Sequence, residues 1–110
     1  MVEFLPPQLL EHVAERFRVL GDATRLSILR TLLERGELSV GEVVLRTGAT
    51  QANVSKHLSV LLRAGIVSRR QEGTAAYYAV ADPSLEKLCD IVCDRLREQN
   101  AEEARIFADV

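Results

Sequence analysis

The fold is decided by residues 39–64, which read SVGEVVLRTGATQANVSKHLSVLLRA. Ser39 and Glu42 have the spacing of a capping box, in which each side chain accepts a bond from the other residue's backbone N–H. This pattern predicts the start of a short helix. A tight turn, Thr-Gly-Ala-Thr, follows, and its last residue, Thr50, can cap a second helix over 51–64. Two helices joined in this way form the outline of a helix-turn-helix at about 40–64.

The second of these helices has two chemically different faces. At about 100° per residue, its apolar side chains point one way, and we expect them to pack on the short helix and on Leu26 and Leu29. These inward residues are Val54, Leu58, Leu61 and Leu62. The opposite face is small, polar and basic, and consists of Ala52, Lys56, Ser59 and Arg63, flanked by Asn53 and Ser55. Such a face suits a DNA major groove about 12 Å wide, which a large aliphatic side chain would obstruct.

The chemistry of these side chains predicts separate roles in DNA binding. Hydrogen bonds to base edges are expected from Gln51, Asn53 and Ser55 near the helix start. Phosphate contacts are expected from Lys56 and Arg63, and Arg69 and Arg70 of the following hairpin could reach a backbone or the minor groove. His57 lies at the margin of the apolar face, where we expect a half-buried, hydrogen-bonded structural role.

The rest of the chain completes a mainly α fold with a small β-hairpin, in the order α-α-α-α-β-β-α. Two helices precede the helix-turn-helix, the second of them capped by Asp22. Alternating side chains around a Glu-Gly-Thr turn predict a hairpin, or wing, at about 66–80, with one of Tyr77 and Tyr78 packed inward. A last helix is expected at about 83–107 after Asp82 and Pro83. We interpret residues 1–110 as a single winged helix-turn-helix domain.

Composition and charge narrow the class of protein. The chain is 47% hydrophobic and 27% charged and has two cysteines, and we find no signal peptide, no membrane-spanning run and too few cysteines for a disulfide scaffold. We therefore expect a cytoplasmic protein without a membrane partner. The net charge is −2, but residues 43–71 contain five basic residues and no acidic one: Arg46, Lys56, Arg63, Arg69 and Arg70. Binding to a polyanion needs such a local positive surface.

Several segments together resemble the ArsR/SmtB family of arsenical-resistance-type repressors. They are LGDATRLSIL at 20–29, ELSVGE at 37–42, QANVSKHLSVL at 51–61, AGIV at 64–67 and the paired tyrosines at 77–78. The resemblance covers roughly residues 15–82. It implies a homodimer joined through its first and last helices, which binds an imperfect palindrome of double-stranded DNA and leaves it when an inducer binds.

The family's best-known inducer sites are not matched here. One uses a Cys-Val-Cys placement where this chain has Ser39-Val40-Gly41, and another expects histidines where Ser84 and Arg95 stand. The remaining candidate is the pair Cys89 and Cys93, which lies on neighbouring turns of one helix face. Two thiolates there could ligate a soft metalloid such as arsenite, or act as a redox or persulfide pair. Alternatively, both cysteines only fill the dimer interface. No metal site is established and no cofactor is required.

Two other classes of function are less consistent with the sequence. An enzyme is disfavoured, because the chain has no Gly-rich phosphate loop, no HExxH motif and no Cys–His pair in sequence context. A winged-helix protein-interaction module, or a constitutive DNA-binding regulator without an inducer site, stays open as an alternative. The acid-free stretch at 43–71 favours DNA over a protein partner. The sequence therefore predicts a DNA-binding transcriptional repressor.

Overall fold

A computed structural model describes residues 4–100 of the chain. A short 3-10 helix, Pro7–Leu9, leads into five α-helices: α1 (Leu10–Leu20), α2 (Ala23–Arg35), α3 (Val40–Thr47), α4 (Gln51–Arg63) and α5 (Ser84–Gln99). The strands are β1 (Leu38–Ser39), β2 (Val67–Glu72) and β3 (Ala75–Val80). The predicted order of helices and hairpin is confirmed. The part of the predicted last helix beyond residue 100 lies outside the described residues.

The sheet has one strand more than the sequence predicted. The strand β1 pairs antiparallel with β3, so that the order across the sheet is β1-β3-β2. A strand of two residues, the second of which is itself the cap of α3, carries too short a pattern to be recognised from the sequence. The consequence is that the wing is attached to the chain segment from which α3 starts.

The ends of the helices are formed by the caps that the sequence indicated. The Asp22 carboxylate accepts from Arg25 N at 2.9 Å, and the Ser39–Glu42 capping box has bonds of 3.2 and 2.9 Å. The helix α4 ends in a Schellman motif, with Ile66 N donating to Leu61 O at 3.0 Å. That turn passes through Gly65 at φ 75°, which a glycine adopts without steric cost. The boundaries of the helix-turn-helix are therefore set locally.

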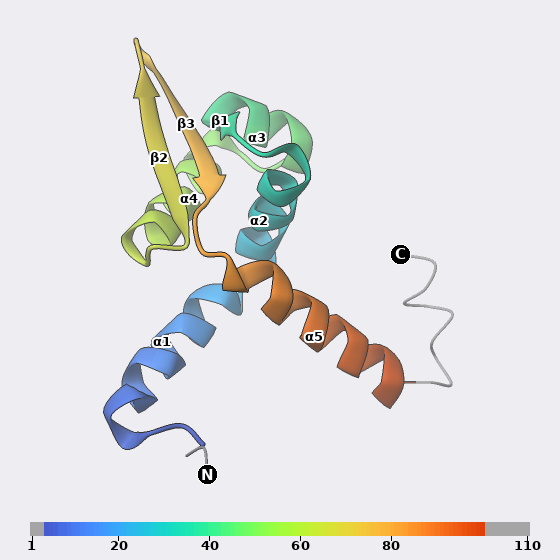
Figure 1. The fold of residues 1–110 in the computed structure, drawn as a ribbon. Coiled ribbons are helices and arrows are strands. Elements are labelled where there is room, and N and C mark those ends of the chain that lie inside the picture. Colours follow the sequence, from blue (N-terminus) through green and yellow to red (C-terminus); the bar gives the residue numbers. More distant parts are fainter. Residues whose placement is uncertain (1–3, 101–110) are drawn as a thin grey trace.

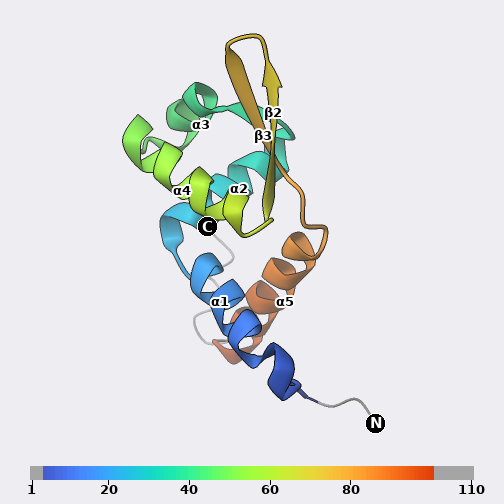
Figure 2. The same ribbon diagram turned by 90° about the vertical axis from the view of Figure 1, so that its left-hand side faces the viewer.

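The core lies between α2, α3, α4 and the inner face of the sheet. Ile28 and Leu32 of α2, Val43 of α3 and Ile66 are fully buried, together with the inner face of α4. As Figure 1 shows, the hairpin projects from one end of this body while α1 and α5 extend from the other. The two views together place α1 and α5 at the same end of the molecule, opposite the tip of the wing (Figure 2). No helix within residues 4–100 is long and apolar enough to cross a membrane.

Two predicted core contacts are wrong. Leu62, placed on the inner face of α4 by its helical angle, is 37% exposed, and Leu26 is 39% exposed. Leu61, its neighbour in the last turn of α4, is fully buried, so the covered face of the helix is narrower than the helical angle indicated and Leu62 lies at its margin. Leu26 instead lines the grooves on both sides of α5. Leu29, by contrast, is buried as predicted.

The helix α1 is connected to the rest of the molecule by Arg16. Its guanidinium contacts the Asp82 carboxylate at 2.6 Å and donates to the Ala64 carbonyl at 3.1 Å. Asp82 also accepts from the backbone N–H and the hydroxyl of Ser84 at the start of α5. Bonds from Ser84, together with the Arg16 charge, hold the pKa of Asp82 below its ordinary value. One arginine thus connects α1, the end of α4 and the start of α5.

Candidate nucleic-acid interface and thiol pair

The predicted DNA-contacting face of α4 is a continuous exposed stripe. On the inner side of the helix, Val54, Leu58 and Leu61 are fully buried and fix its rotation about its axis. The seven α4 residues predicted to contact DNA all lie in the exposed class: Gln51, Ala52, Asn53, Ser55, Lys56, Ser59 and Arg63. Because the inner face is anchored in the core, the outer face is presented as a rigid surface.

The start of α4 is fixed by the turn before it. Gly48 adopts φ 75° and ends α3, and the Thr50 hydroxyl accepts from Asn53 N at 3.2 Å. This cap places the first turn of α4, with Gln51 and Asn53, at the exposed end of the helix. The small side chains Ala52 and Ser59 leave room for the helix to approach a groove closely.

His57 has the structural role expected from the sequence. It is only 8% exposed, and its Nδ1 lies 3.3 Å from a terminal nitrogen of Arg25. The Arg25 Nε in turn donates to the Val19 carbonyl at 2.6 Å. The three residues connect α4 to the junction of α1 and α2. Within residues 4–100, no group of three or more His, Cys, Asp or Glu side chains could hold a metal ion.

The two arginines of the wing lie on opposite faces of the sheet. Successive residues of a strand alternate between faces. Arg69 is the Cα partner of Tyr78, which packs against the core, so Arg69 belongs to the face that is turned toward the helices. Arg70 is the partner of Tyr77 on the outer face. The prediction that one tyrosine packs inward is therefore confirmed, with Tyr78 as the inner one.

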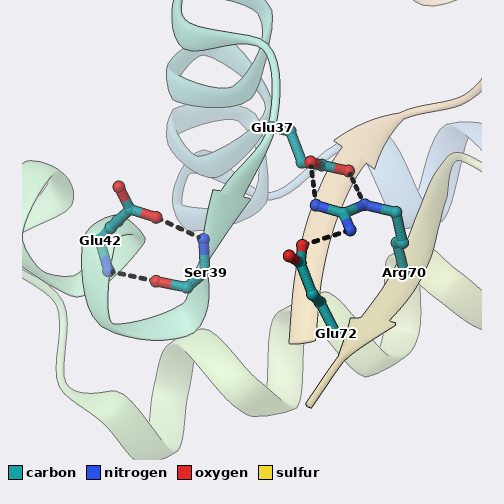
Figure 3. Close-up of polar contacts among 5 residues, drawn as sticks. All are labelled: Glu37, Ser39, Glu42, Arg70 and Glu72. Carbon is teal, nitrogen blue, oxygen red and sulfur yellow. Dashed lines mark hydrogen bonds and ion pairs between the residues drawn. The ribbon is translucent and has the colours of Figure 1, made fainter. Parts of the chain in front are cut away.

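Arg70 is held by two carboxylates and an aromatic ring. Its Nε and one terminal nitrogen donate to the two oxygens of Glu37 at 3.0 and 2.8 Å, and the other terminal nitrogen contacts Glu72 at 2.6 Å (Figure 3). Its guanidinium carbon also lies 5.0 Å from the centre of the Tyr77 ring. The hydrogen bonds from Arg70 hold the pKa of Glu37 below its ordinary value, and the two carboxylates raise the pKa of Arg70. Much of the Arg70 charge is thus offset locally.

The other basic residues of the 43–71 stretch differ from Arg70 in this respect. Among the described residues, Arg46, Lys56, Arg63 and Arg69 form no salt bridge. Arg69 donates only to the neutral Gln71 side chain at 2.9 Å. Their charges therefore stay available to a polyanion. Sequence analysis missed Glu37 as a partner of Arg70, because 33 positions separate the two residues and no local pattern connects them.

The two cysteines lie on α5 beside an apolar groove. Cys89 is half-buried, Cys93 is exposed, and both are free thiols. Both line a groove of about 470 Å³ between α2 and α5, together with Leu26, Leu29 and Leu33. Burial raises the pKa of the Cys89 thiol, and the neighbouring Cys93 and Asp90 raise it further. Burial and the neighbouring groups thus disfavour the thiolate form of Cys89.

A second apolar groove, of about 360 Å³, lies between α1 and α5. Its lining includes large side chains that are exposed in the single chain: Phe17, Leu26, Val92 and Leu96. Clustered exposure of this kind is typical of a surface that another protein covers. The wing lies at the end of the molecule opposite α1 and α5, the helices that carry most of these exposed apolar side chains (Figure 1).

A capped helix-turn-helix, a basic and acid-free recognition face and an adjoining wing define a winged helix-turn-helix DNA-binding protein. Residues 22–69 match the model of the bacterial regulatory proteins of the arsR family. The chain belongs to this family of transcriptional regulators. Its sequence-based prediction as a DNA-binding repressor of this type is confirmed.

Similar proteins support the assignment along most of the chain. An uncharacterized HTH-type transcriptional regulator of Methanocaldococcus jannaschii, MJ1325, is 38% identical over 74% of this chain and 92% of its own length. The arsenical resistance operon repressor of Bacillus subtilis is 33% identical over 76% of this chain and 85% of its own. A probable mercury resistance operon repressor of Streptomyces lividans is 44% identical over 68% of this chain, which spans 59% of that protein.

Solved structures share the architecture. The crystal structure of Mycobacterium tuberculosis Rv0081 superimposes with a TM-score of 0.77 at 34% identity, over 87% of this chain and 96% of that one. The homodimeric winged helix-turn-helix domain of Mycobacterium bovis Mb0332 superimposes with a TM-score of 0.71 at 29% identity, over 93% of this chain and 92% of that one. The fold predicted from the sequence is thereby confirmed.

Proposed function

We propose that this protein represses transcription as a homodimer that binds an imperfect palindrome of double-stranded DNA. The observation that carries the proposal is the exposed outer face of α4, whose basic residues are not neutralised by carboxylates within the described chain. Two-fold symmetry would place two such helices about one turn of DNA apart, in successive major grooves. Because the partner is chromosomal DNA, we place the repressor in the cytoplasm.

The residues of this surface are assigned by their chemistry. Gln51, Asn53 and Ser55, at the start of α4, hydrogen-bond base edges. Lys56, Arg63 and Arg69 contact phosphates and fix the docking register, while Ala52 and Ser59 permit close approach. Arg70 was also predicted to contact DNA, but two of its guanidinium nitrogens already donate to the Glu37 carboxylate.

The dimer is proposed to form through α1 and α5. The large apolar side chains exposed between these helices support this interface, since a partner copy would remove them from water. An interface at this end leaves the α4 stripe and the wing of each copy open to DNA (Figure 1). A single domain of this size gains stability from such shared burial. We assign the chain no catalytic role and no required cofactor, in keeping with relatives that are transcriptional regulators.

Salt dependence tests the proposed function. Binding to a duplex from the gene's own upstream region should weaken steeply between 50 and 200 mM salt, on the order of 10³-fold for about six phosphate contacts, because each contact releases counterions.

The variant Lys56→Ala should weaken binding to operator and to random DNA by a similar factor, about three- to tenfold. It should also make the dependence of log affinity on log salt concentration shallower by about 0.9. Fluorescence anisotropy measures both. A failure to bind any duplex at low salt would favour the protein-interaction module instead.

Asn53→Ala serves as the matched variant on the same helix face. It should cost about 1–3 kcal/mol on the operator and much less on random DNA, with preference relaxed at one base position. Equal losses on both kinds of DNA would contradict a base-reading role for Asn53.

Release by an inducer is proposed to act through Cys89 and Cys93. The two thiols sit at the apolar groove between α2 and α5, next to the proposed dimer surface, so a bound thiol-directed ligand would change the packing of α5. A soft metalloid such as arsenite, bridged by both sulfurs, and a sulfur or redox signal are the candidate inducers.

Replacing both cysteines with serine tests this site. The double variant should bind the operator with unchanged affinity but resist release by arsenite, polysulfide and oxidant. Each single variant should resist arsenite as well, because bridging needs both sulfurs. If the double variant is still released by all three compounds, the cysteines only fill space in the interface. If the unmodified protein is released by none of them, it is a constitutive regulator with respect to these signals.

A further inference from the structure

The wing is connected to the helix-turn-helix by a chain of polar contacts across the outer face of the sheet. Arg70 of β2 lies over Tyr77 of β3 and reaches Glu37, the residue directly before β1 (Figure 3). In the sheet, Ser39, Tyr77 and Arg70 form one row, because Tyr77 is the Cα partner of both other residues. A single side chain thus spans all three strands.

The far end of this contact adjoins the start of α3. Glu37 precedes Ser39 by two residues, and Ser39 with Glu42 forms the capping box of that helix. Only the two-residue strand β1 separates Arg70's partner from the helix-turn-helix. A shift of β2 would therefore pull on the segment from which α3 begins, and Figure 3 shows the capping box and the Arg70 contacts side by side.

We infer that Arg70 and Glu37 are a positioning pair, which fixes the wing relative to α4 so that Arg69 and the recognition face meet DNA together. Arg70 acts through Glu37 and does not itself bind phosphate. Two parallel bonds between a guanidinium and a carboxylate define an orientation as well as a distance. The Glu72 contact on the same strand engages the third nitrogen, so that all three guanidinium nitrogens of Arg70 already contact carboxylates. This inference rests on the proposed DNA-binding function and deepens it.

The variant Glu37→Gln distinguishes a positioning role of Arg70 from phosphate binding, because the two roles predict opposite changes in operator affinity. If Arg70 positions the wing, the variant should lower operator affinity about three- to tenfold with an unchanged salt slope, as expected for losing a well-oriented surface ion pair. If Arg70 instead binds phosphate, removing its acidic competitor should raise the affinity and steepen the salt slope. Fluorescence anisotropy at several salt concentrations gives both quantities, and an increase in affinity would overturn the inference.

Glu34→Gln is the matched control. It removes the same charge three residues earlier, from an exposed side chain whose partner, Arg30, is 3.9 Å away on the same helix. Operator affinity should not change in this variant. An equal loss in Glu34→Gln would show that the effect does not depend on the contact with Arg70, and would contradict a special role for Glu37.

Arg70→Lys provides a second, conservative test. A lysine keeps the charge that a phosphate needs but cannot form the two parallel bonds to Glu37. We expect it to lose as much affinity as Glu37→Gln, and the double variant to lose no more than either single one. Retained affinity in Arg70→Lys would contradict the inference.

The variants Arg69→Gln and Lys56→Ala test the DNA surface separately from the Arg70–Glu37 pair. Each should lower the salt slope by about 0.9, whether or not Arg70 has a positioning role.

Discussion

Leu58→Ala is expected to lower the free energy of unfolding by about 3 kcal/mol, within the 2–5 kcal/mol typical of buried leucines. Leu58 is fully buried on the inner face of α4, where the truncation would leave a cavity between this helix and the core. Because small domains have only about 5–15 kcal/mol of total stability, the loss is a large fraction of it. Urea unfolding followed by far-UV circular dichroism measures the change, at one protein concentration because the proposed dimerisation would contribute to stability.

Leu62→Ala is the matched control on the same helix. Leu62 is 37% exposed, so that its truncation removes less apolar burial and leaves no closed cavity. A cost below about 1 kcal/mol is expected, as for surface positions. If the two variants were equally destabilised, the rotation of α4 about its axis would differ from the one described, and the exposed stripe with it.

Ser59→Glu is expected to abolish operator binding while the fold stays intact. Ser59 lies in the middle of the exposed α4 stripe. A carboxylate there would stand against phosphates and base-edge acceptors, and like charges brought together at an interface cost several kcal/mol. This corresponds to a loss of at least about 100-fold in affinity. An electrophoretic mobility shift with the upstream duplex measures the loss, and a thermal melt verifies folding.

The control for charge is Gln99→Glu, which introduces the same charge at the end of α5, far from the proposed DNA surface (Figure 1). Its operator affinity should stay within about twofold of the unchanged protein, because a distant exposed charge is screened beyond about 10 Å at 0.1 M salt. Normal DNA binding by Ser59→Glu would show that α4 does not enter a groove. The assignment of its outer face would then be wrong.

The proposed DNA surface and the two cysteines lie on different elements of the fold. The wing lies at one end, and α1 and α5 lie at the other (Figure 1), with Cys89 and Cys93 on α5. Arg16 connects the two ends, because it bonds both the Ala64 carbonyl at the end of α4 and Asp82 before α5. A change in α5 packing thus has a short covalent and hydrogen-bonded route to the recognition helix.

The sequence by itself determined the helices, their caps and the turn between α3 and α4. These features depend on residues three or four positions apart, such as Asp22 with Arg25, Ser39 with Glu42 and Thr50 with Asn53. The helical angle of 100° also identified the outer face of α4 correctly. Each of these outcomes follows from local geometry, which a sequence pattern records directly.

Only the tertiary structure decided which residues meet across the fold. The pairing of β1 with β3, the exposure of Leu26 and Leu62 and the contact of Arg70 with Glu37 all depend on where distant segments lie. Two arginines adjacent in the sequence, Arg69 and Arg70, look alike as positive charges. Their surroundings differ in the fold, because successive residues of a strand point to opposite faces of the sheet. Glu37 lies on the outer face, where it contacts Arg70 but not Arg69. The sequence shows which residues are charged, whereas only the folded structure shows which of these charges are paired with an opposite charge.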